Sequence, residues 1–380
     1  TVAIMAGADG LAHLFADKMP EKAFYQQMAS NKSFIIPTMT VMRKLTNGKT
    51  DVPSIVNPQT ENYLSEEDIS NIYSQFPIGR KARKKLSYNI AKKVLMNMKK
   101  AGIQILAGSD SPNPGTIYGA SLHHELELLV DAGLSPIEAL RAATSAPATI
   151  FGLKNKGKIV EGLPADLVLV NGNPLENISS TQNIHAVWKN GVAVDRETYR
   201  AKIHKEKEKE INARKAGMVS DFENGKTTAF GMGWLRSLDS IFGGHSKVDR
   251  FVIADDGGAG SKHSLKVSGE LKGGFIFPWA GAIFVPGASP MIPVDLSDHA
   301  KISFWMKGDD RTKSVQVMIF ANSLGYMPAT KTITINNSWK EYTLNFSDFK
   351  RVDAKGIKGL IFSAAEKGSF TFYLDNVKFQ

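Results

Sequence analysis

At 380 residues the chain is too long for one ordinary core and predicts roughly two to three domains. Its hydrophobic fraction of 42% is normal for a globular protein, and no apolar run approaches the ~20 residues that a membrane span needs, so none is expected. The net charge is +10, and the absence of cysteine excludes disulfides, zinc–thiolate clusters and a cysteine nucleophile; the compartment stays open between the cytoplasm and a bacterial-type periplasmic or secreted location.

The first half of the chain alternates between short apolar segments and helical segments. The apolar segments are typical of buried parallel strands, and they comprise residues 10–15, 33–36 and 103–108. The predicted helices comprise residues 21–31, 65–100 with a break near 77–79, 122–132 and 136–144, and a polar loop is predicted at 43–64. This order predicts a (β/α) barrel or a doubly wound sheet. No Gly-x-Gly-x-x-Gly follows a strand, which argues against a dinucleotide-binding fold.

Lysines and arginines are concentrated between residues 80 and 100, where no acid offsets them. Such a run could bind nucleic acid. However, Val94, Leu95 and Met98 recur there at helical spacing, and no nucleic-acid-binding motif accompanies the charge. We therefore interpret the run as the solvated face of a helix and expect no nucleic-acid partner.

The second half of the chain has the pattern of β structure. Residues 157–170 and 184–194 predict short strands, the latter as a hairpin around Asn190-Gly191. A charged helical segment at 200–217 marks the expected domain boundary. Beyond it, short strand-like segments separated by turn signals predict an all-β sandwich or jelly roll. They comprise residues 264–267, 275–277, 300–306, 314–320, 331–335, 340–345, 359–364 and 370–379.

Two residues occupy the positions where a parallel barrel carries its chemistry, at the C-terminal ends of strands. His13 follows the first predicted strand and Asp110 follows the third. An imidazole and a carboxylate could bind one divalent metal, and the carboxylate could also accept a proton from metal-bound water. Alone the pair is a weak signal, because a histidine near a strand end is more often structural.

Several stretches of the first half share motifs with a known hydrolase family. They are residues 6–13 (AGADGLAH), 35–38 (IIPT), 105–110 (ILAGSD), 121–126 (SLHHEL), 139–144 (ALRAAT) and 162–168 (GLPADLV). Residues 2–195 thus resemble the C-terminal section of the amidohydrolase superfamily, in its imidazolonepropionase-like and Xaa-Pro-dipeptidase-like branch. The resemblance implies the last strands of a metal-dependent hydrolase TIM barrel at residues 1–156 and strands of its small β-sandwich at 157–199.

The same resemblance assigns roles to individual residues. His13 is implied to be a metal ligand, and Asp110 both a metal ligand and the general base for the attacking water. Zinc is the preferred metal, although manganese and iron also suit these ligands. Members of the family hydrolyse C–N bonds, so the expected substrate is a small cyclic amide or peptide. His123 lies where the family often carries a histidine, so it is either a substrate-side residue or a packing residue of the helix start.

The sequence departs from the family in one large respect. The family's His-x-His pair, its bridging Lys or Glu and its further His, all on earlier strands, have no counterpart here. We therefore expect this chain to be the C-terminal part of the hydrolase, with an incomplete active site that needs the missing N-terminal half of the same protein as its partner. A homo-oligomer that swaps elements is the alternative.

The last part of the chain carries a resemblance of its own, in residues 221–223 (DFE), 231–234 (GMGW), 304–308 (FWMKG) and 374–377 (LDNV). It resembles the complex I intermediate-associated family, which is similar to galactose-binding-like jelly rolls and family 11 carbohydrate-binding modules. This implies a jelly roll at 220–380 behind a charged linker helix at 200–219.

Ligand binding by this β domain is open at the level of sequence. Glu223 and Asp375 occupy places where similar jelly rolls hold a structural calcium ion, but both are equally interpreted as surface or turn residues. Trp234, Trp279 and Trp305 could stack on a sugar or pack in the core, and we expect the core for Trp305. The main interpretation is a metallohydrolase segment fused to a jelly roll. The alternative is a non-catalytic binding protein whose β domain docks on glycan or protein.

Overall fold

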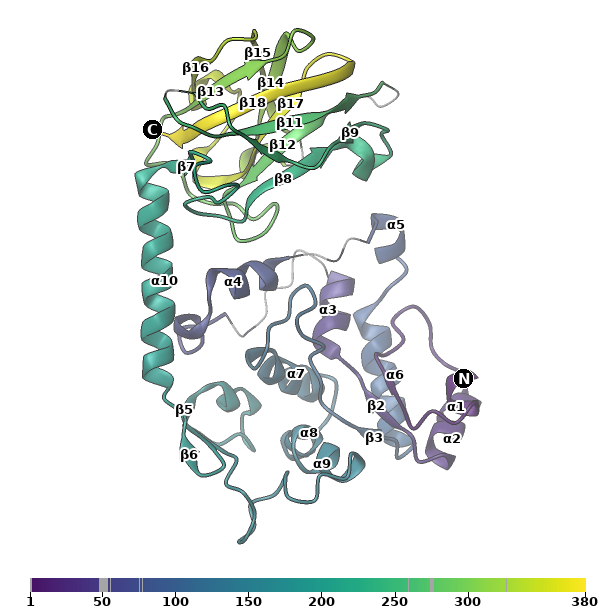
Figure 1. The fold of residues 1–380 in the computed structure, drawn as a ribbon. Coiled ribbons are helices and arrows are strands. Elements are labelled where there is room, and N and C mark those ends of the chain that lie inside the picture. Colours follow the sequence, from purple (N-terminus) through teal and green to yellow (C-terminus); the bar gives the residue numbers. More distant parts are fainter. Residues whose placement is uncertain are drawn as a thin grey trace. The chain divides into compact units, whose positions relative to one another are not determined.

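The computed structural model describes residues 2–47, 54, 56–74, 76, 78–258, 260–273, 277–325 and 327–380. The chain divides into two compact units, residues 1–204 (unit 1) and 205–380 (unit 2), drawn in Figure 1. The division falls inside α10 (Arg196–Ala216), the helix formed by the charged segment of the sequence. In the described part of the chain, no helix has both the length and the hydrophobicity that a membrane crossing requires.

Unit 1 is built on a sheet of three parallel strands in the order β1 (Gly10–Ala12), β2 (Phe34–Ile36) and β3 (Gln104–Ile105). All three lie within the predicted strand segments. The middle strand places Ile35 in the apolar core, whereas Phe34 and Ile36 point to the opposite, less buried face. Parallel strands separated by helices are the arrangement that the sequence pattern predicts.

The helices of unit 1 follow the predicted order with one correction. The segment 43–64 was expected to be a loop, but its first residues belong to a helix. The helices are α1 (Val2–Met5), α2 (Lys22–Ser30), α3 (Met39–Asn47), α4 (Glu66–Tyr73), α5 (Arg80–Arg83), α6 (Tyr88–Lys100), α7 (Ala120–Asp131), α8 (Pro136–Ala143) and α9 (Ser145–Ile150), with a short 3-10 helix at Glu61–Tyr63.

The sequence explains which face of α6 is buried and where α4 and α8 begin. Helix α6 buries Val94, Leu95 and Met98 on one face, which leaves its lysines on the other, where Lys92 and Lys99 pair with acids of α7 and α8. Helices α4 and α8 each begin with a capping box, in which a serine and an acid three residues later satisfy each other's backbone N–H groups.

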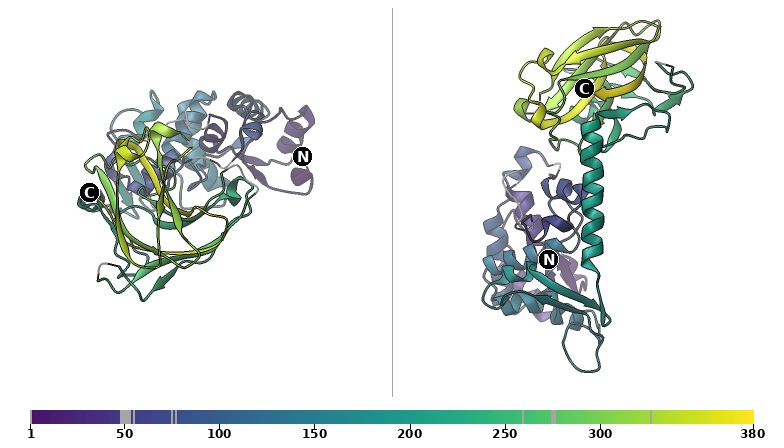
Figure 2. Two further views of the ribbon diagram at one scale, coloured as in Figure 1. Left: turned by 90° about the horizontal axis from the view of Figure 1, so that it is seen from above. Right: turned by 90° about the vertical axis from the view of Figure 1, so that its left-hand side faces the viewer.

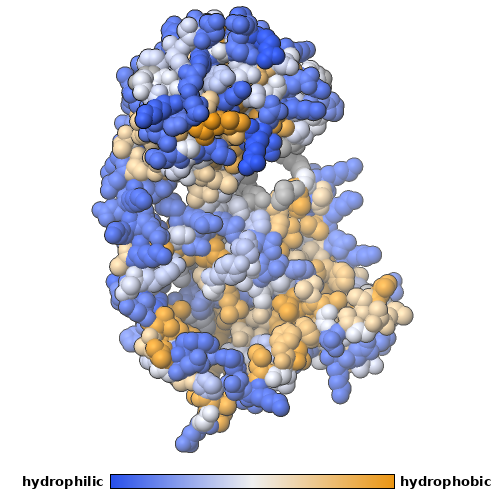
Figure 3. All heavy atoms as spheres, viewed as in Figure 1, coloured by the Kyte–Doolittle hydropathy of each residue, from blue (hydrophilic) through white to orange (hydrophobic). Residues whose placement is uncertain are grey.

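A second, antiparallel sheet in unit 1 consists of β4 (Leu167–Val170), β5 (Ile184–Lys189) and β6 (Val192–Ala193). The tight turn between β5 and β6 is the predicted one, with positive φ at both Asn190 and Gly191. Val168 and Leu169 point to opposite faces of this sheet, yet they are 59% and 49% exposed. Apolar side chains are thus open to solvent on both faces, and others reach the surface elsewhere in the unit (Figure 3).

Unit 2 is a sandwich of two antiparallel sheets, whose layers can be followed in Figure 2. The first sheet has the order β10 (Val252–Ala254), β11 (Ser264–Leu271), β18 (Gly368–Phe379), β13 (Lys301–Gly308) and β16 (Lys340–Asn345), with β7 (Met218–Ser220) against β18 and β9 (Lys247–Val248) against β11. The second sheet has the order β15 (Ala329–Thr334), β14 (Ser314–Ala321), β17 (Ile357–Ala364), β12 (Ala280–Val285) and β8 (Gly233–Leu238).

Side chains from both sheets meet in one apolar core. Trp234 belongs to this core and donates its indole N–H to the Ser220 hydroxyl at 3.0 Å. The expectation for Trp305 was wrong. Its strand neighbours Phe304 and Met306 are fully buried in the core, so alternation places Trp305 on the opposite face of the sheet. Of the predicted strand at 275–277, only Phe277 lies among the described residues.

Candidate functional site

Each of the three parallel strands is followed by a residue with an unusual backbone conformation. The φ angles are 72° at His13, 48° at Thr38 and 54° at Asp110. Positive φ is uncommon for any residue other than glycine, and it is an outlier for a β-branched threonine. Such a conformation costs ~1–3 kcal/mol and persists only where the surrounding structure holds it in place. The three strained residues mark the C-terminal edge of the sheet as the candidate site.

The structure brings the two sequence-predicted metal ligands together at this edge. His13 Nε2 lies 3.7 Å from Asp110 Oδ2, and both side chains are partly open to solvent. The other ring nitrogen of His13, Nδ1, lies 2.8 Å from the buried Thr38 hydroxyl. Asn113 donates from its side-chain amide to Asp110 Oδ2 at 2.8 Å, which limits the rotation of that carboxylate. Residues from three strand ends therefore converge on one small region.

These residues fit part of a divalent metal site. Two ligands of a tetrahedral zinc, each ~2.1 Å from the metal, are ~3.4 Å apart, close to the observed separation of 3.7 Å. An imidazole that binds metal through one nitrogen usually donates its other N–H to an oxygen, and the Thr38 hydroxyl oxygen lies within hydrogen-bond distance of His13 Nδ1. Within the described ranges no group of three His, Cys, Asp or Glu residues could hold a metal, so this pair is one ligand short of the three protein ligands that catalytic zinc usually takes.

A buried carboxylate next to this edge was missed by the sequence analysis. Glu125, on α7, is fully buried and accepts the backbone N–H groups of Met39 and Thr40 at 2.9 and 2.8 Å, as well as the Thr40 hydroxyl at 2.8 Å. Burial raises the pKa of Glu125 to about 7, although the hydrogen bonds from Thr40 and Met39 favour the ionised form. Glu125 thereby ties α7 to the first turn of α3, immediately after Thr38. The available signal was its helical spacing, because Glu125 lies three and four residues before the buried Leu128 and Leu129 and so shares their face.

The two histidines that precede Glu125 have different surroundings. His123 is largely buried, which lowers its pKa, and its Nδ1 has no hydrogen-bond partner among the described residues. A substrate-side role for His123 therefore stays a prediction. His124 belongs to a polar network, with Nδ1 at 3.0 Å from the Ser54 hydroxyl and 3.3 Å from Glu127 Oε2.

Glu127 joins this network to the segment before β5. It accepts hydrogen bonds from Ser179 and Gln182, in the short helix Ile178–Gln182. Burial on its own raises the pKa of Glu127, but hydrogen bonds from His124, Ser179 and Ser54 lower it to about 2. The carboxylate is thus ionised near neutral pH and fully engaged, and the network links α7 to the neighbouring helix rather than forming a reactive group.

In unit 2, the predicted calcium ligand Asp375 lies fully buried on β18. Its Oδ2 accepts the backbone N–H of Gly258 at 2.7 Å and the hydroxyl of Ser261, and its Oδ1 accepts the N–H of Asn376 at 2.7 Å. Burial raises the pKa of Asp375, with a smaller contribution in the same direction from the nearby charge of Glu223.

The second predicted calcium ligand, Glu223, faces the same loop. Its Oε1 accepts the backbone N–H groups of Lys262 and His263 at 2.8 and 2.9 Å, and the hydrogen bond from the His263 N–H lowers the pKa of Glu223. Carboxylates are the hard oxygen ligands that calcium takes, but here they accept from N–H and O–H groups, which an ion would have to replace. Calcium binding therefore stays a prediction.

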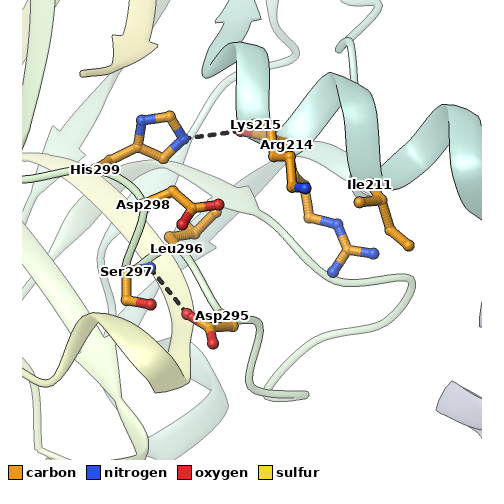
Figure 4. Close-up of a pocket in the computed structure, with 8 residues that line it drawn as sticks. All are labelled: Ile211, Arg214, Lys215, Asp295, Leu296, Ser297, Asp298 and His299. Carbon is orange, nitrogen blue, oxygen red and sulfur yellow. Dashed lines mark hydrogen bonds between the residues drawn. The ribbon is translucent and has the colours of Figure 1, made fainter.

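A shallow hollow of about 220 Å³ lies beside the end of α10 within unit 2. Figure 4 shows its lining: Ile211, Arg214, Lys215, Asp295, Leu296, Ser297, Asp298 and His299. His299 Nε2 lies 2.8 Å from the carbonyl oxygen of Arg214, one of the last carbonyls of the helix. This contact caps the C-terminal end of α10, and the hollow shares no residue with the His13–Asp110 pair.

Comparison with known proteins assigns each half of the chain. Residues 68–194 match the Amidohydrolase family, and residues 222–380 match Carbohydrate binding domain 30. Adenine deaminase 2 of Desulfotalea psychrophila is 36% identical over 87 residues, which are 23% of this chain and 14% of that protein. Ochratoxinase of Aspergillus niger is 36% identical over 98 residues, 24% of this chain and 19% of that protein. The chain thus spans less than a fifth of these curated relatives.

Solved structures are similar to each half separately. The family 11 carbohydrate-binding module of a cellulosomal cellulase of Clostridium thermocellum has 23% identity and a TM-score of 0.33, covering 43% of this chain and 92% of that chain. A Xaa-Pro dipeptidase with bound methionine has 22% identity and a TM-score of 0.38, covering 50% of this chain and 41% of that chain. The chain therefore joins a hydrolase-type module to a binding-type module. The match to the Amidohydrolase family lies in the first module and the match to Carbohydrate binding domain 30 in the second, in agreement with the resemblances carried by the sequence motifs.

Proposed function

We propose that this chain is the C-terminal part of a metal-dependent amidohydrolase, which cleaves a C–N bond in a cyclic amide or small peptide-like substrate. The observation that carries the proposal is the separation of 3.7 Å between His13 Nε2 and Asp110 Oδ2, which follow β1 and β3, the two strands on either side of β2 in one sheet. A bound divalent metal, with zinc preferred, supplies Lewis-acid activation of the attacking water at neutral pH. Its ligands in this chain are His13 and Asp110.

The reaction itself is carried by the carboxylate. Asp110 accepts a proton from the water as the water oxygen attacks the carbonyl carbon of the substrate. Asp110 then delivers that proton to the substrate's leaving nitrogen as the C–N bond breaks. Water is consumed, and a carboxylic acid and an amine are formed. Asn113 holds Asp110 Oδ2 through its amide N–H. The His13 imidazole lies on the opposite side of the site, and its Nδ1 contacts the Thr38 hydroxyl.

We also propose that the remaining metal ligands come from the N-terminal half of the same hydrolase. Two observations support this partner: the described residues offer only a pair of ligands, and the small sheet exposes Val168 and Leu169 on opposite faces. Further strands would cover such side chains and gain ~25 cal/mol for each Å² of apolar surface removed from water. A swapped homo-oligomer is the alternative, and intact mass combined with gel filtration separates the two.

A second candidate function rests on the β domain. Because residues 222–380 match a carbohydrate-binding family, the chain could serve as a binding protein in which unit 2 docks on glycan and unit 1 is a scaffold. Binding to a panel of soluble glycans, measured by calorimetry, tests this function without reference to hydrolysis. Binding without any hydrolysis by the reconstituted protein would favour this second candidate.

The hydrolase proposal is tested by activity of the chain combined with its N-terminal half, against a panel of N-acyl amino acids and dipeptides. We expect hydrolysis by the wild type and a loss of roughly 10²–10⁴-fold in kcat for Asp110→Asn, because the general base is removed while the shape is kept. His185→Ala, at an exposed histidine of β5, is the control and should retain activity. Equal turnover of Asp110→Asn and wild type would show that another group takes the proton.

A further inference from the structure

The contact between His13 and Thr38 has the geometry of a device that fixes an imidazole tautomer. Thr38 Oγ1 lies 2.8 Å from His13 Nδ1, and the Thr38 side chain is 2% exposed. A backbone hydrogen bond of 2.8 Å from the His13 N–H to the Ile36 carbonyl continues the parallel pairing beyond β1. This bond keeps His13 beside the end of β2, so the imidazole and the hydroxyl meet in one fixed register.

The strained backbone of Thr38 is held from its C-terminal side by the start of α3. The Thr38 carbonyl accepts the backbone N–H of Met42 at 3.0 Å, in the first turn of the helix. Met39 and Thr40 directly follow Thr38, and their backbone N–H groups donate to the two side-chain oxygens of Glu125. A carboxylate at a helix N-terminus is favoured by the unsatisfied N–H groups there. Glu125 therefore fixes the helix start from which the Thr38 hydroxyl projects.

We infer that Thr38 and Glu125 are positioning residues for the proposed metal ligand His13. The Thr38 hydroxyl oxygen accepts the Nδ1 proton of the neutral imidazole, and Glu125 holds the α3 start that keeps this oxygen in place. With the proton on Nδ1, the lone pair of Nε2 faces Asp110 and is free to bind metal. The metal part of this inference rests on the proposed function, whereas the tautomer does not.

The inference predicts a specific failure when the hydroxyl is lost. Without a hydroxyl at position 38, the proton on Nδ1 loses its hydrogen-bond acceptor. The tautomer with the proton on Nε2 is then the more stable one, because Asp110 Oδ2 lies 3.7 Å from Nε2. That tautomer directs an N–H at the position a metal would occupy. Thr38→Val removes the hydroxyl while keeping the β-branched shape, and Thr38→Ser keeps the hydroxyl. These two variants therefore separate loss of the hydrogen bond from change of packing.

The test uses the 380-residue chain with ¹⁵N-labelled histidine, at about pH 8, where an ordinary histidine with a pKa of ~6.5 is neutral. Long-range ¹H–¹⁵N spectra distinguish the two tautomers, and the His13 signals are assigned by their loss in His13→Asn. We expect the Nδ1–H form in the wild type and in Thr38→Ser, and a shift toward the Nε2–H form in Thr38→Val. Glu125→Gln should produce a mixture, because the helix start is less firmly held.

Zinc titration of the same variants, each combined with the N-terminal half of the hydrolase, gives an independent reading. The expected loss of affinity for Thr38→Val is roughly 10–100-fold, the usual effect of removing the partner of a metal-binding histidine, with Thr38→Ser close to wild type. An Nε2–H tautomer in the wild type overturns the inference, even if Thr38→Val does not fold. An unchanged tautomer in Thr38→Val overturns it as well. A wild type that binds no zinc when combined with the N-terminal half, but shows the expected tautomers, contradicts the metal-dependent function and leaves the Thr38 assignment intact.

Discussion

Replacing Glu125 by glutamine is expected to remove a large part of the pH dependence of unit 1 stability. Glu125 is fully buried and holds the first two N–H groups of α3 together with the Thr40 hydroxyl. Glutamine has nearly the same shape but does not titrate, and its amide NH₂ replaces an oxygen that accepts hydrogen bonds. Leaving a buried donor without an acceptor costs about 1–3 kcal/mol at any pH.

The magnitude of the pH effect follows from the shift in pKa. Burial raises the pKa of Glu125 from 4.5 to about 7, against the hydrogen bonds of Thr40 and Met39. Between these values the folded state binds more protons than the unfolded chain, so the free energy of unfolding falls as the pH rises. The stabilising contribution is complete below 4.5 and is lost as the pH passes through about 7. From about pH 5 to about pH 8 the loss is roughly 2–3 kcal/mol.

Urea denaturation followed by circular dichroism, repeated across this pH range, measures the effect. The difference in stability between wild type and Glu125→Gln should shrink by roughly 2–3 kcal/mol as the pH rises from about 5 to about 8. Glu67→Gln, at an exposed carboxylate in the first turn of α4, is the matched control and should keep the wild-type pH dependence. A difference in stability between wild type and Glu125→Gln that stays constant with pH would refute the prediction that burial raises the pKa of Glu125 in the folded state.

Two further predictions concern packing and ion binding. Gly108→Ala would place a methyl group 2.5 Å from Cγ2 of Ile36, so we expect the free energy of unfolding, measured by urea denaturation, to fall by roughly 1–3 kcal/mol. Gly79→Ala, which adds a methyl group in open space, is the control and should leave the stability unchanged. If calcium binds at Glu223 and Asp375, a chelator should lower the thermal midpoint of unit 2, by the equivalent of about 2.7 kcal/mol when calcium is present at 100 times its Kd; an unchanged midpoint would remove calcium from the account.

The parallel strands of unit 1 could be predicted because their signal is local. Each lies in a short apolar run with a clear end: His13 directly follows Ala12 after the first strand, and Pro37 directly follows Ile36 after the second. The sequence pattern also selected His13 and Asp110, because a barrel collects strand ends at one edge. It could not place Thr38 in the site, since a hydroxyl beside an imidazole depends on the register of two strands and on a positive φ.

The elements that escaped prediction depend on contacts between distant segments. Strand β12 contains Gly281, which weakens its β pattern, yet a Cβ there would lie 1.9 Å from the carbonyl oxygen of Phe362 on β17. Only the paired strand shows why glycine is required. Trp305 was assigned to the core from its alternating neighbours, but alternation fixes two faces without saying which face is covered. The last residues of helix α3, from 43 to 47, were assigned to a loop, and the acid that holds the start of this helix is Glu125, far along the sequence.

The central claim, that His13 and Asp110 share one divalent metal, is tested most directly by zinc binding to the chain combined with its N-terminal half, measured with equilibrium dialysis and elemental analysis. The account predicts about one zinc per chain for the wild type and for His185→Ala, and a marked loss for both His13→Ala and Asp110→Asn, because each removes a ligand. Equal zinc content in the wild type and these two ligand variants would contradict the claim.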